Sequence, residues 1–199
     1  MEFDVIDVFE KRHSFYSINN NLDVKNEEIK ALILRNLDIY PSSFNAQESR
    51  IILLLNQQHS NFWELVKGEL FKVAEEHKKA QIEQKIASFK AGYGTILYFI
   101  DTEIVSKLSQ NYPLFAPNFP LWAEQSNAML QFMIWTSLSQ RKIGASLQHY
   151  NPIIDDAVKN KFNVNPKWKL IAQMPFGGIS KEVKAHEIKE NPDRLIVCA

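Results

Sequence analysis

The feature that most constrains the fold is a helix-length stretch, residues 121–140, that is apolar almost all the way round. Its large apolar residues are Trp122, Met129, Leu130, Phe132, Met133, Ile134, Trp135 and Leu138. A helix with so little polar face is buried on most sides. In a chain of 199 residues this pattern favours a central helix shared with a second copy of the chain. A helix in the core of one monomer is the alternative.

The composition is that of one folded domain without net charge. Hydrophobic residues make up 45% of the chain, which is enough for a core. Lys plus Arg and Asp plus Glu number 23 each, so neither nucleic acid nor an anionic membrane surface is expected as the main partner. No linker divides the sequence, and we predict a single domain over residues 1–199.

Cysteine content and hydropathy indicate a cytoplasmic protein. Cys198 is the only cysteine, so the chain can form neither an internal disulfide nor a Cys-rich metal site. Residues 1–10 carry acids instead of the basic start of a signal peptide. No apolar stretch reaches the length that spans a membrane.

Hydrophobic spacing predicts an α+β fold, in which a sheet is flanked by helices. Helices are expected over 2–12, from Asp23 or Asn26 onward, and over 61–77, 102–110 and 121–140, with a solvated helical stretch at 75–85. Strands are expected over 50–55, 94–100, 143–147, 170–176 and 194–197. Residues 14–22 and the proline-rich 112–120 are expected to be loops.

Most familiar catalytic motifs are missing from the sequence. It contains no GxGxxG, P-loop, GxSxG or HExxH pattern, so a separate Rossmann domain for a nicotinamide is not expected. The five histidines lack the spacing of metal ligands, and we predict no metal site.

Three polar segments remain as candidate sites. In residues 11–16, Arg12 is suited to clamp a phosphate and Ser14 to donate its hydroxyl; a solvated helix end is the alternative. Residues 41–47 are suited to meet the polar edge of a ring, or form an ordinary capped loop. Small residues in 144–152 permit a flat ring to approach closely, although Gly144 can equally serve packing alone.

Taken in order, six segments resemble the nitroreductase family. They are RHSFYSI (12–18), PSSFNAQESR (41–50), FKAGYGTILYF (89–99), YPLFAPNFPLWAEQS (112–126), IGASLQHYNP (143–152) and WKLIAQMPFG (168–177). The resemblance is nearest to the branch of short bacterial copper-induced nitroreductases and fungal fatty-acid-repression-mutant proteins. It implies an intertwined homodimer with a mostly antiparallel central sheet flanked by helices. It also implies one FMN per subunit at the interface, with hydride taken from NADH or NADPH and passed to a nitroaromatic or quinone.

The resemblance also assigns roles to individual residues. Arg12 and Ser14 match contacts to the FMN phosphate and ribityl chain, and His13 lies between them. Residues of one loop, matching contacts to the flavin of the other subunit, are Ser42, Ser43 and Asn45. Gln148 and His149 match a segment whose backbone faces the flavin ring, and Lys184 and Arg194 match C-terminal phosphate contacts.

One position departs from the family pattern. Tyr16 stands where many members carry Lys or Arg near the flavin N1–C2 region, and Lys85 or Lys90 is a possible substitute for that charge. The departure keeps two alternatives open: an FMN-binding stress or lipid-signalling regulator with little turnover, and a structural dimer without flavin. Phe44, Phe119 and Trp122 are candidates to wall the acceptor site, or are plain core or interface aromatics.

Overall fold

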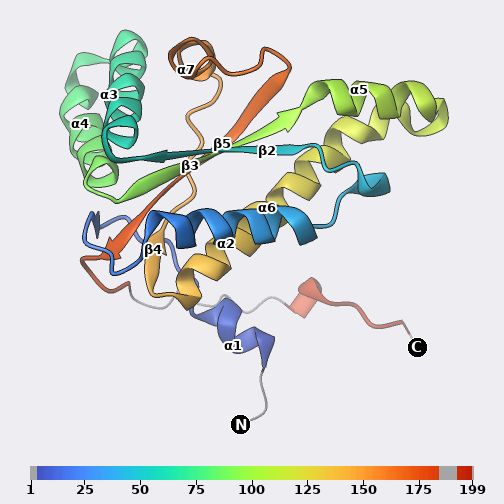
Figure 1. Ribbon diagram of the computed structural model, residues 1–199, viewed down its shortest axis with the longest axis horizontal. Helices are drawn as coiled ribbons and strands as arrows, with labels where there is room; N and C mark the ends of the chain where they lie inside the picture. The colour runs from blue at the N-terminus through green and yellow to red at the C-terminus, as the bar shows by residue number, and fades with distance from the viewer. Residues whose placement is uncertain (1–3, 184–191, 199) are drawn as a thin grey trace.

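In the computed structural model, which describes residues 4–183 and 192–198, helices cover both faces of one sheet (Figure 1). Among the described residues the sheet has five strands: β1 (Ile18–Asn19), β2 (Ser49–Leu55), β3 (Gly94–Asp101), β4 (Ile143–Ala145) and β5 (Trp168–Ile179). They follow the order β1-β5-β3-β2, with β4 also paired to β5, and all these pairs are antiparallel. The expected α+β fold with a mostly antiparallel sheet is confirmed.

The two central strands, β3 and β5, separate two hydrophobic cores. Side chains of β3 alternate between them: Leu97 and Phe99 enter one core, and Ile96 and Tyr98 enter the other. All four are fully buried. A strand covered on both faces is apolar along its whole length, which explains the uninterrupted run at this point of the sequence.

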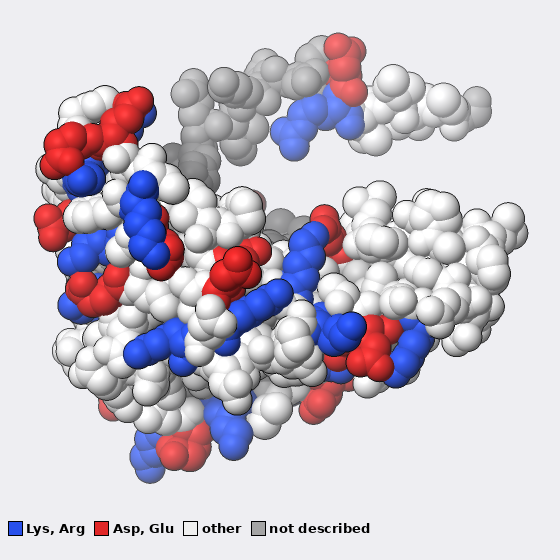
Figure 2. Space-filling view, turned by 90° about the horizontal axis from the view of Figure 1, so that it is seen from above, with Lys and Arg blue, Asp and Glu red and all other residues white. Residues whose placement is uncertain are grey.

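One face of the sheet, here called the α3–α4 face, is covered by α3 (Asn56–Val73), α4 (Glu76–Lys90) and α7 (Asp155–Phe162). Phe62 and Trp63 of α3 are completely buried in its core. Its outer surface carries acidic and basic side chains side by side (Figure 2). Several of these form ion pairs along the helices, which is the usual character of a solvated surface.

The opposite face, here called the α2–α6 face, is covered by α2 (Asn26–Ile39) and the long α6 (Phe119–Gln140), with α1 (Val5–Glu10) beneath α6 (Figure 1). Although α6 buries its inner side, both helices also expose large apolar side chains. These are Leu34, Ile39, Met129 and Phe132, with exposed fractions of 39–64%. The predicted helix over 121–140 is therefore present, and its apolar residues reach both the core and the surface.

Several elements differ from the sequence expectations. The prolines at 112–120 do not prevent helical turns, because Pro113 opens the 3₁₀ helix η2 (Pro113–Asn118) and Pro120 lies in the first turn of α6, where a missing N–H costs little. The charged helix α4 continues to Lys90 and buries Ile86 and Phe89. The short strand β1 and the helix α7 were not expected, whereas α5 (Thr102–Asn111) was.

Two predictions were wrong, one about the start of α2 and one about residues 194–197. The cap residue of α2 is Lys25, whose N–H donates to the Glu28 side chain, in place of Asp23 or Asn26. The terminal strand expected over 194–197 is absent from the described residues. That region instead has the 3₁₀ turn η3 (Pro192–Arg194) and an irregular, exposed continuation. A strand needs a neighbouring edge to pair with, and this segment meets none within the described chain.

Candidate functional site

The segment after α1 is held against the edge strand β4. Ser14 forms a parallel bridge with Ala145, and the Phe15 N–H donates to the Ala145 carbonyl at 2.9 Å. A Cβ added at Gly144 would lie 2.9 Å from Ile179 and 3.1 Å from Phe15, so this glycine is required for close packing of the segment. The chain thereby fixes residues 12–15 beside β4.

Arg12 is the most unusual cation of this segment. Its guanidinium carbon lies 4.3 Å from the centre of the Trp135 ring of α6. Its Nε atom is buried and has no hydrogen-bond partner within the described chain, and burial lowers the pKa of the Arg12 guanidinium. A buried N–H without an acceptor is costly, so the hydrogen bonding of Arg12 is incomplete within the described chain.

The other predicted residues of the segment are Ser14 and His13. Ser14 is half-buried, and its hydroxyl has no hydrogen-bond partner in the residues described. The ring of His13 packs edge-on against Phe15, with 6.4 Å between ring centres. Arg12 Nε and the Ser14 hydroxyl are thus both without a hydrogen-bond partner in the described residues, and their assignment to an anion site stays a prediction.

Tyr16 is exposed and lies beside the end of α4. Its ring centre is 6.4 Å from that of Phe89, and the Lys85 ammonium lies 5.9 Å from the same Phe89 ring. Lys90 is paired with Glu64 at 2.6 Å. Of the two lysines considered as substitutes for a charge at position 16, Lys85 has no carboxylate partner in the described structure, and it approaches the same Phe89 ring as Tyr16.

The third predicted segment continues from β4 along β5. The backbone N–H and carbonyl of Gln148 both bond to Gln173, at 2.7 and 2.9 Å, and its side chain donates to Ser146. The Gln148 N–H is therefore not available to a ring. His149 is exposed, its N–H has no acceptor among the described residues, and it lines a cavity of about 410 Å³ with Gln131 and other residues.

The loop over 41–47 keeps its shape through its own hydrogen bonds. The Gln47 N–H donates to Ser42 Oγ, and the Gln47 side chain donates to Asn45 Oδ1. Phe44, Asn45 and Gln47 have positive φ angles, which non-glycine residues adopt only when their surroundings hold them there. The loop presents the exposed Phe44 ring, which lies 4.6 Å from Tyr112. Ser43 begins the 3₁₀ turn η1 (Ser43–Asn45).

The two predicted flavin-contacting groups lie at opposite ends of the sheet. Ala145, the partner of Ser14, pairs with β5 opposite the Gly94 end of β3. Ser49, which follows the 41–47 loop, pairs with Ile100 at the other end of β3. Six residue steps of a strand separate these ends, about 20 Å. One chain does not bring Arg12 and Ser42 around a single ring.

The predicted C-terminal phosphate contacts are Lys184 and Arg194. Lys184 lies outside the described residues. Arg194 ends the exposed η3, and residues 192–198 stand clear of the body of the molecule in Figures 1 and 2. Arg194 is exposed and makes no hydrogen bond or ion pair within the described ranges.

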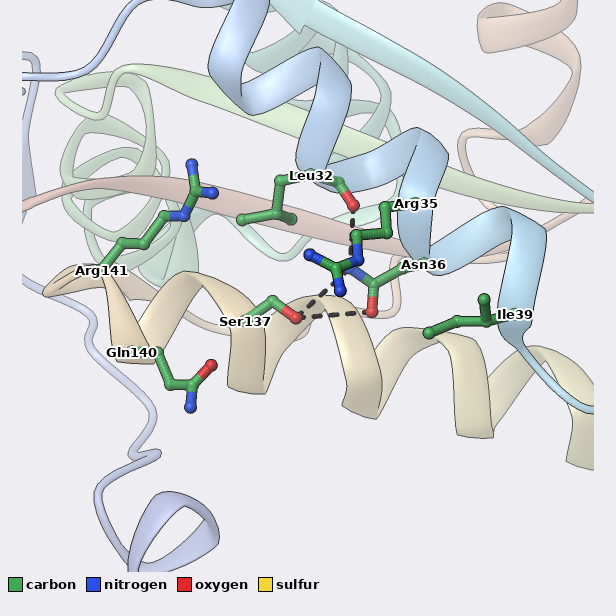
Figure 3. Close-up of a pocket in the computed structure, with 7 residues that line it drawn as sticks. All are labelled: Leu32, Arg35, Asn36, Ile39, Ser137, Gln140 and Arg141. Carbon is green, nitrogen blue, oxygen red and sulfur yellow. Dashed lines mark hydrogen bonds between the residues drawn. The ribbon is translucent and has the colours of Figure 1, made fainter. Parts of the chain in front are cut away.

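A polar cavity of about 330 Å³ between α2 and α6 was not anticipated from the sequence (Figure 3). Arg35 and Arg141 line it, and neither forms an ion pair within the described chain. Between them, Asn36 and Ser137 exchange hydrogen bonds at 3.3 and 3.4 Å across the two helices. Asn36 and Ser137 are 101 positions apart in the sequence, so no local pattern could have revealed the cavity.

The acceptor-site aromatics are divided between core and surface. Phe119 is buried in a small core with Val105 and Ala123. Phe44 is exposed and Trp122 is partly buried. Phe119 is therefore a core aromatic in this chain, while the other two have ring surface that remains accessible.

Neither a membrane-spanning helix nor a metal-binding cluster is found among the described residues. No helix there is long and apolar enough to cross the hydrocarbon layer of a membrane. No group of three or more His, Cys, Asp or Glu in the described ranges is arranged to hold a metal ion.

Comparison with known proteins relates the whole fold to one family. The sequence model of the nitroreductase family matches residues 9–178. The nitroreductase FRM2 of Saccharomyces cerevisiae is 27% identical over 168 residues, which are 83% of each chain. Nitroreductase CinD from Lactococcus lactis, solved with chloramphenicol, has a TM-score of 0.89 and 34% identity, covering 98% of this chain and 100% of that one. A nitroreductase with bound FMN from Desulfitobacterium hafniense shares the fold, with a TM-score of 0.72 at 14% identity and full coverage of both chains.

Proposed function

The chain belongs to the nitroreductase family, and on this premise we propose that it is an FMN-dependent oxidoreductase. In this proposal it takes hydride from NADH or NADPH and then reduces a nitroaromatic or a quinone at the same place. The single cysteine, exposed Cys198, suits the cytoplasm that we propose as its compartment.

The observation that carries the proposal is the state of Arg12. A guanidinium held on a ring, with a buried Nε that lacks a partner in the described chain, fits one terminal phosphate of FMN. Ser14 would add its hydroxyl to the same phosphate or to the ribityl chain. FMN, when bound, supplies the two-electron chemistry, and the protein supplies position and electrostatics.

The proposal requires two copies of the chain. The 41–47 loop is about 20 Å from the Arg12 segment along β3, so Ser42, Ser43 and Asn45 would serve the flavin of the partner subunit. The α2–α6 face offers the surface for such a homodimer, because it exposes Leu34, Ile39 and other large apolar side chains. The groups left without partners in one chain would then be completed by the flavin and the second chain.

Small aromatic compounds are the acceptors we propose. CinD, whose fold this chain follows over nearly its full length, was solved with chloramphenicol, which carries a nitrophenyl ring. In this chain the exposed Phe44 ring would stack on such a ring. Phe44 and Trp122 both contact the Phe119 ring, at 5.6 and 5.3 Å between ring centres. No side chain needs to act as an acid or base for hydride to pass between stacked rings, since geometry supplies most of the effect.

The test is to purify the protein, identify its flavin by chromatography and follow its visible spectrum without oxygen. NADH or NADPH should bleach the flavin, and 4-nitrophenol or a quinone added afterwards should restore the colour. Initial rates should give the parallel double-reciprocal lines of a ping-pong reaction. Apoprotein that fails to bind added FMN would overturn the proposal.

A regulator with little turnover is the second candidate, and Tyr16 is the observation that favours it. An exposed phenol stands where a fixed positive charge would favour electron acceptance by the flavin. For this candidate, FMN should bind while NADH and NADPH reduce it far more slowly than one flavin per minute. Rapid bleaching followed by rapid reoxidation excludes it.

A further inference from the structure

Three contacts from successive turns of α6 hold the segment that ends at Arg12. Phe132 packs edge-on against Phe9, with ring centres 5.1 Å apart. Trp135 lies under the Arg12 guanidinium at 4.3 Å, and Ser139 Oγ donates to the Lys11 carbonyl at 3.1 Å. The spacing of three and four residues places these side chains on one side of the helix. Together they fix both the backbone and the side chain at the predicted phosphate site.

We propose that Trp135 is a positioning residue for phosphate binding, acting through Arg12. The inference rests on the proposed function, because it assumes that Arg12 meets the FMN phosphate. A guanidinium is planar, and its N–H donors point outward in that plane. Stacking on an aromatic face therefore fixes the direction of the group while leaving its donors and its charge free for an anion.

Arg50 provides a comparison within the same chain. Its guanidinium also lies over an indole, that of Trp168, at 5.9 Å. Its donors, however, are used internally: Nη1 donates to the carbonyls of Gln47 and Ser49, and Nη2 donates to Asp101 at 3.2 Å. Arg50 thus supports the fold. Arg12 has the ring but lacks these acceptors, which is the arrangement expected for a group that binds a ligand.

An aromatic ring at position 135 holds the Arg12 guanidinium in a way that a carboxylate at this position would not. A carboxylate would hold Arg12 by accepting from the same donors that a phosphate needs, and it would cancel the charge. Trp135 avoids this competition. The buried indole N–H of Trp135 also lacks an acceptor within the described chain, so the surroundings of Arg12 are incomplete without a further group.

The test compares two ligands that differ only in the phosphate. Dissociation constants for FMN and riboflavin are measured by fluorescence titration of apoprotein, for the native chain and for W135L, W135F, R12A and R12A/W135L. Trp135→Leu should weaken FMN binding about 3- to 30-fold, the range expected for a lost cation–π contact, and should leave riboflavin binding unchanged. Trp135→Phe, which keeps a ring face but removes the indole N–H, should retain most of the affinity. In the R12A background, Trp135→Leu should have no further effect on FMN.

A control variant separates positioning from general packing. Trp168→Leu removes the ring beneath Arg50, which is not part of the predicted phosphate site. It should leave the ratio of FMN to riboflavin affinity unchanged. Equal losses for the two ligands in W135L, additive losses in R12A/W135L, or a W135F variant as weak as W135L would each overturn the inference. Native protein that binds neither flavin would instead overturn the proposed function.

Discussion

The two faces of the sheet differ in how completely one chain satisfies its buried polar groups. On the α3–α4 face, Trp63 Nε1 donates to Thr95 Oγ1 at 2.9 Å, and His59 lies between Thr95 and the Lys90 carbonyl at 2.8 and 3.1 Å. On or beside the α2–α6 face, Arg12 Nε, Trp135 Nε1, Thr136 Oγ1 and both carboxylate oxygens of Glu48 are buried without a partner in the described chain. Within the described residues, the first face satisfies its buried polar groups in one chain, and the second does not.

The network of the complete face can be assigned atom by atom. A carbonyl only accepts, so His59 Nε2 must carry the proton that it shares with Lys90. Nδ1 of the neutral ring then accepts from the Thr95 hydroxyl, whose oxygen accepts from Trp63. Burial lowers the pKa of His59, which keeps this neutral form at neutral pH. Each donor in the network has one acceptor, which rigidifies the face.

The largest effect should follow from truncation within the complete face. Trp63→Ala removes a fully buried ring and leaves the Thr95 hydroxyl without its donor, so we expect the free energy of unfolding to fall by about 3–5 kcal/mol. Urea denaturation measures the change. Trp122→Ala, at a partly buried position of α6, is the control and should cost less; an equal loss would show that the two faces do not differ as described.

A charged substitution on the α2–α6 face should have a smaller effect, and on association of two chains instead of folding. Met129 on α6 has an exposed fraction of 43%. If this face is the dimer interface, Met129→Glu places an unpaired charge in it and should raise the dimer dissociation constant at least about 100-fold, or 3 kcal/mol. Analytical ultracentrifugation measures this. Val73→Glu, at an apolar position of α3 with an exposed fraction of 66%, should leave the dimer intact. Dissociation by both variants, or by neither, contradicts the assignment.

The next largest effect, on FMN affinity, should follow from removal of the Arg12 guanidinium. Arg12→Ala should weaken FMN binding by about 1.5–3 kcal/mol, the contribution of a hydrogen bond to a charged group, with little loss of stability. Arg12→Lys keeps the charge but loses the planar guanidinium, so its affinity for FMN should lie between that of the native chain and that of Arg12→Ala. Fluorescence titration of apoprotein gives both values. Arg50→Ala provides the reverse case: it should lower stability through its lost bond to Asp101 more than it lowers FMN affinity.

Local features could be predicted from the sequence, and contacts between distant segments could not. The apolar run at 121–140 and the uninterrupted run of β3 depend on local periodicity, and both elements were located within two residues of their ends. The grouping of Arg12 with Ser14 was also local. The contact of Arg12 with Trp135 joins segments more than 120 residues apart, and so does the pairing of Ser14 with Ala145. Such contacts arise from tertiary packing and leave no periodic signal.

Backbone pairing also bears on the prediction for Gln148 and His149, which match a segment whose backbone faces a flavin ring. The strand pairing continues past β4 as an isolated bridge and takes up the Gln148 N–H with Gln173. The N–H of His149, one residue later, has no acceptor in the described chain. A shift of one residue exchanges paired and unpaired groups along a strand, and sequence alone does not fix that register.

The smallest effects should appear as opposite pH dependences of the two faces. Burial raises the pKa of Glu48, despite the nearby Ser126 hydroxyl and Arg50, so its neutral form is favoured in the folded chain. Its contribution to stability is present below the unfolded-state pKa of about 4.3 and is lost as the pH rises toward the folded-state pKa. Glu48→Gln should therefore be more stable than the native chain at pH 7 and should lose this advantage near pH 4. His59 has the opposite sign, because its lowered pKa gives stability that is lost as the pH falls below about 6.5.

Urea denaturation at several pH values, on the native chain, E48Q and H59Q, separates the two contributions. Each residue can change the slope of unfolding free energy by at most about 1.4 kcal/mol per pH unit, since one proton is involved. In E48Q, the free energy of unfolding should fall less than in the native chain between about pH 4.5 and neutrality. In H59Q, it should fall less than in the native chain as the pH drops below about 6.5. If FMN and dimer formation enclose Glu48 further, saturating FMN should enlarge the E48Q effect and leave the H59Q effect unchanged, because the network of His59 is already closed. An E48Q profile parallel to that of the native chain at every pH would mean that Glu48 titrates alike in the folded and unfolded chain, and the carboxylate would then not belong to the incomplete face.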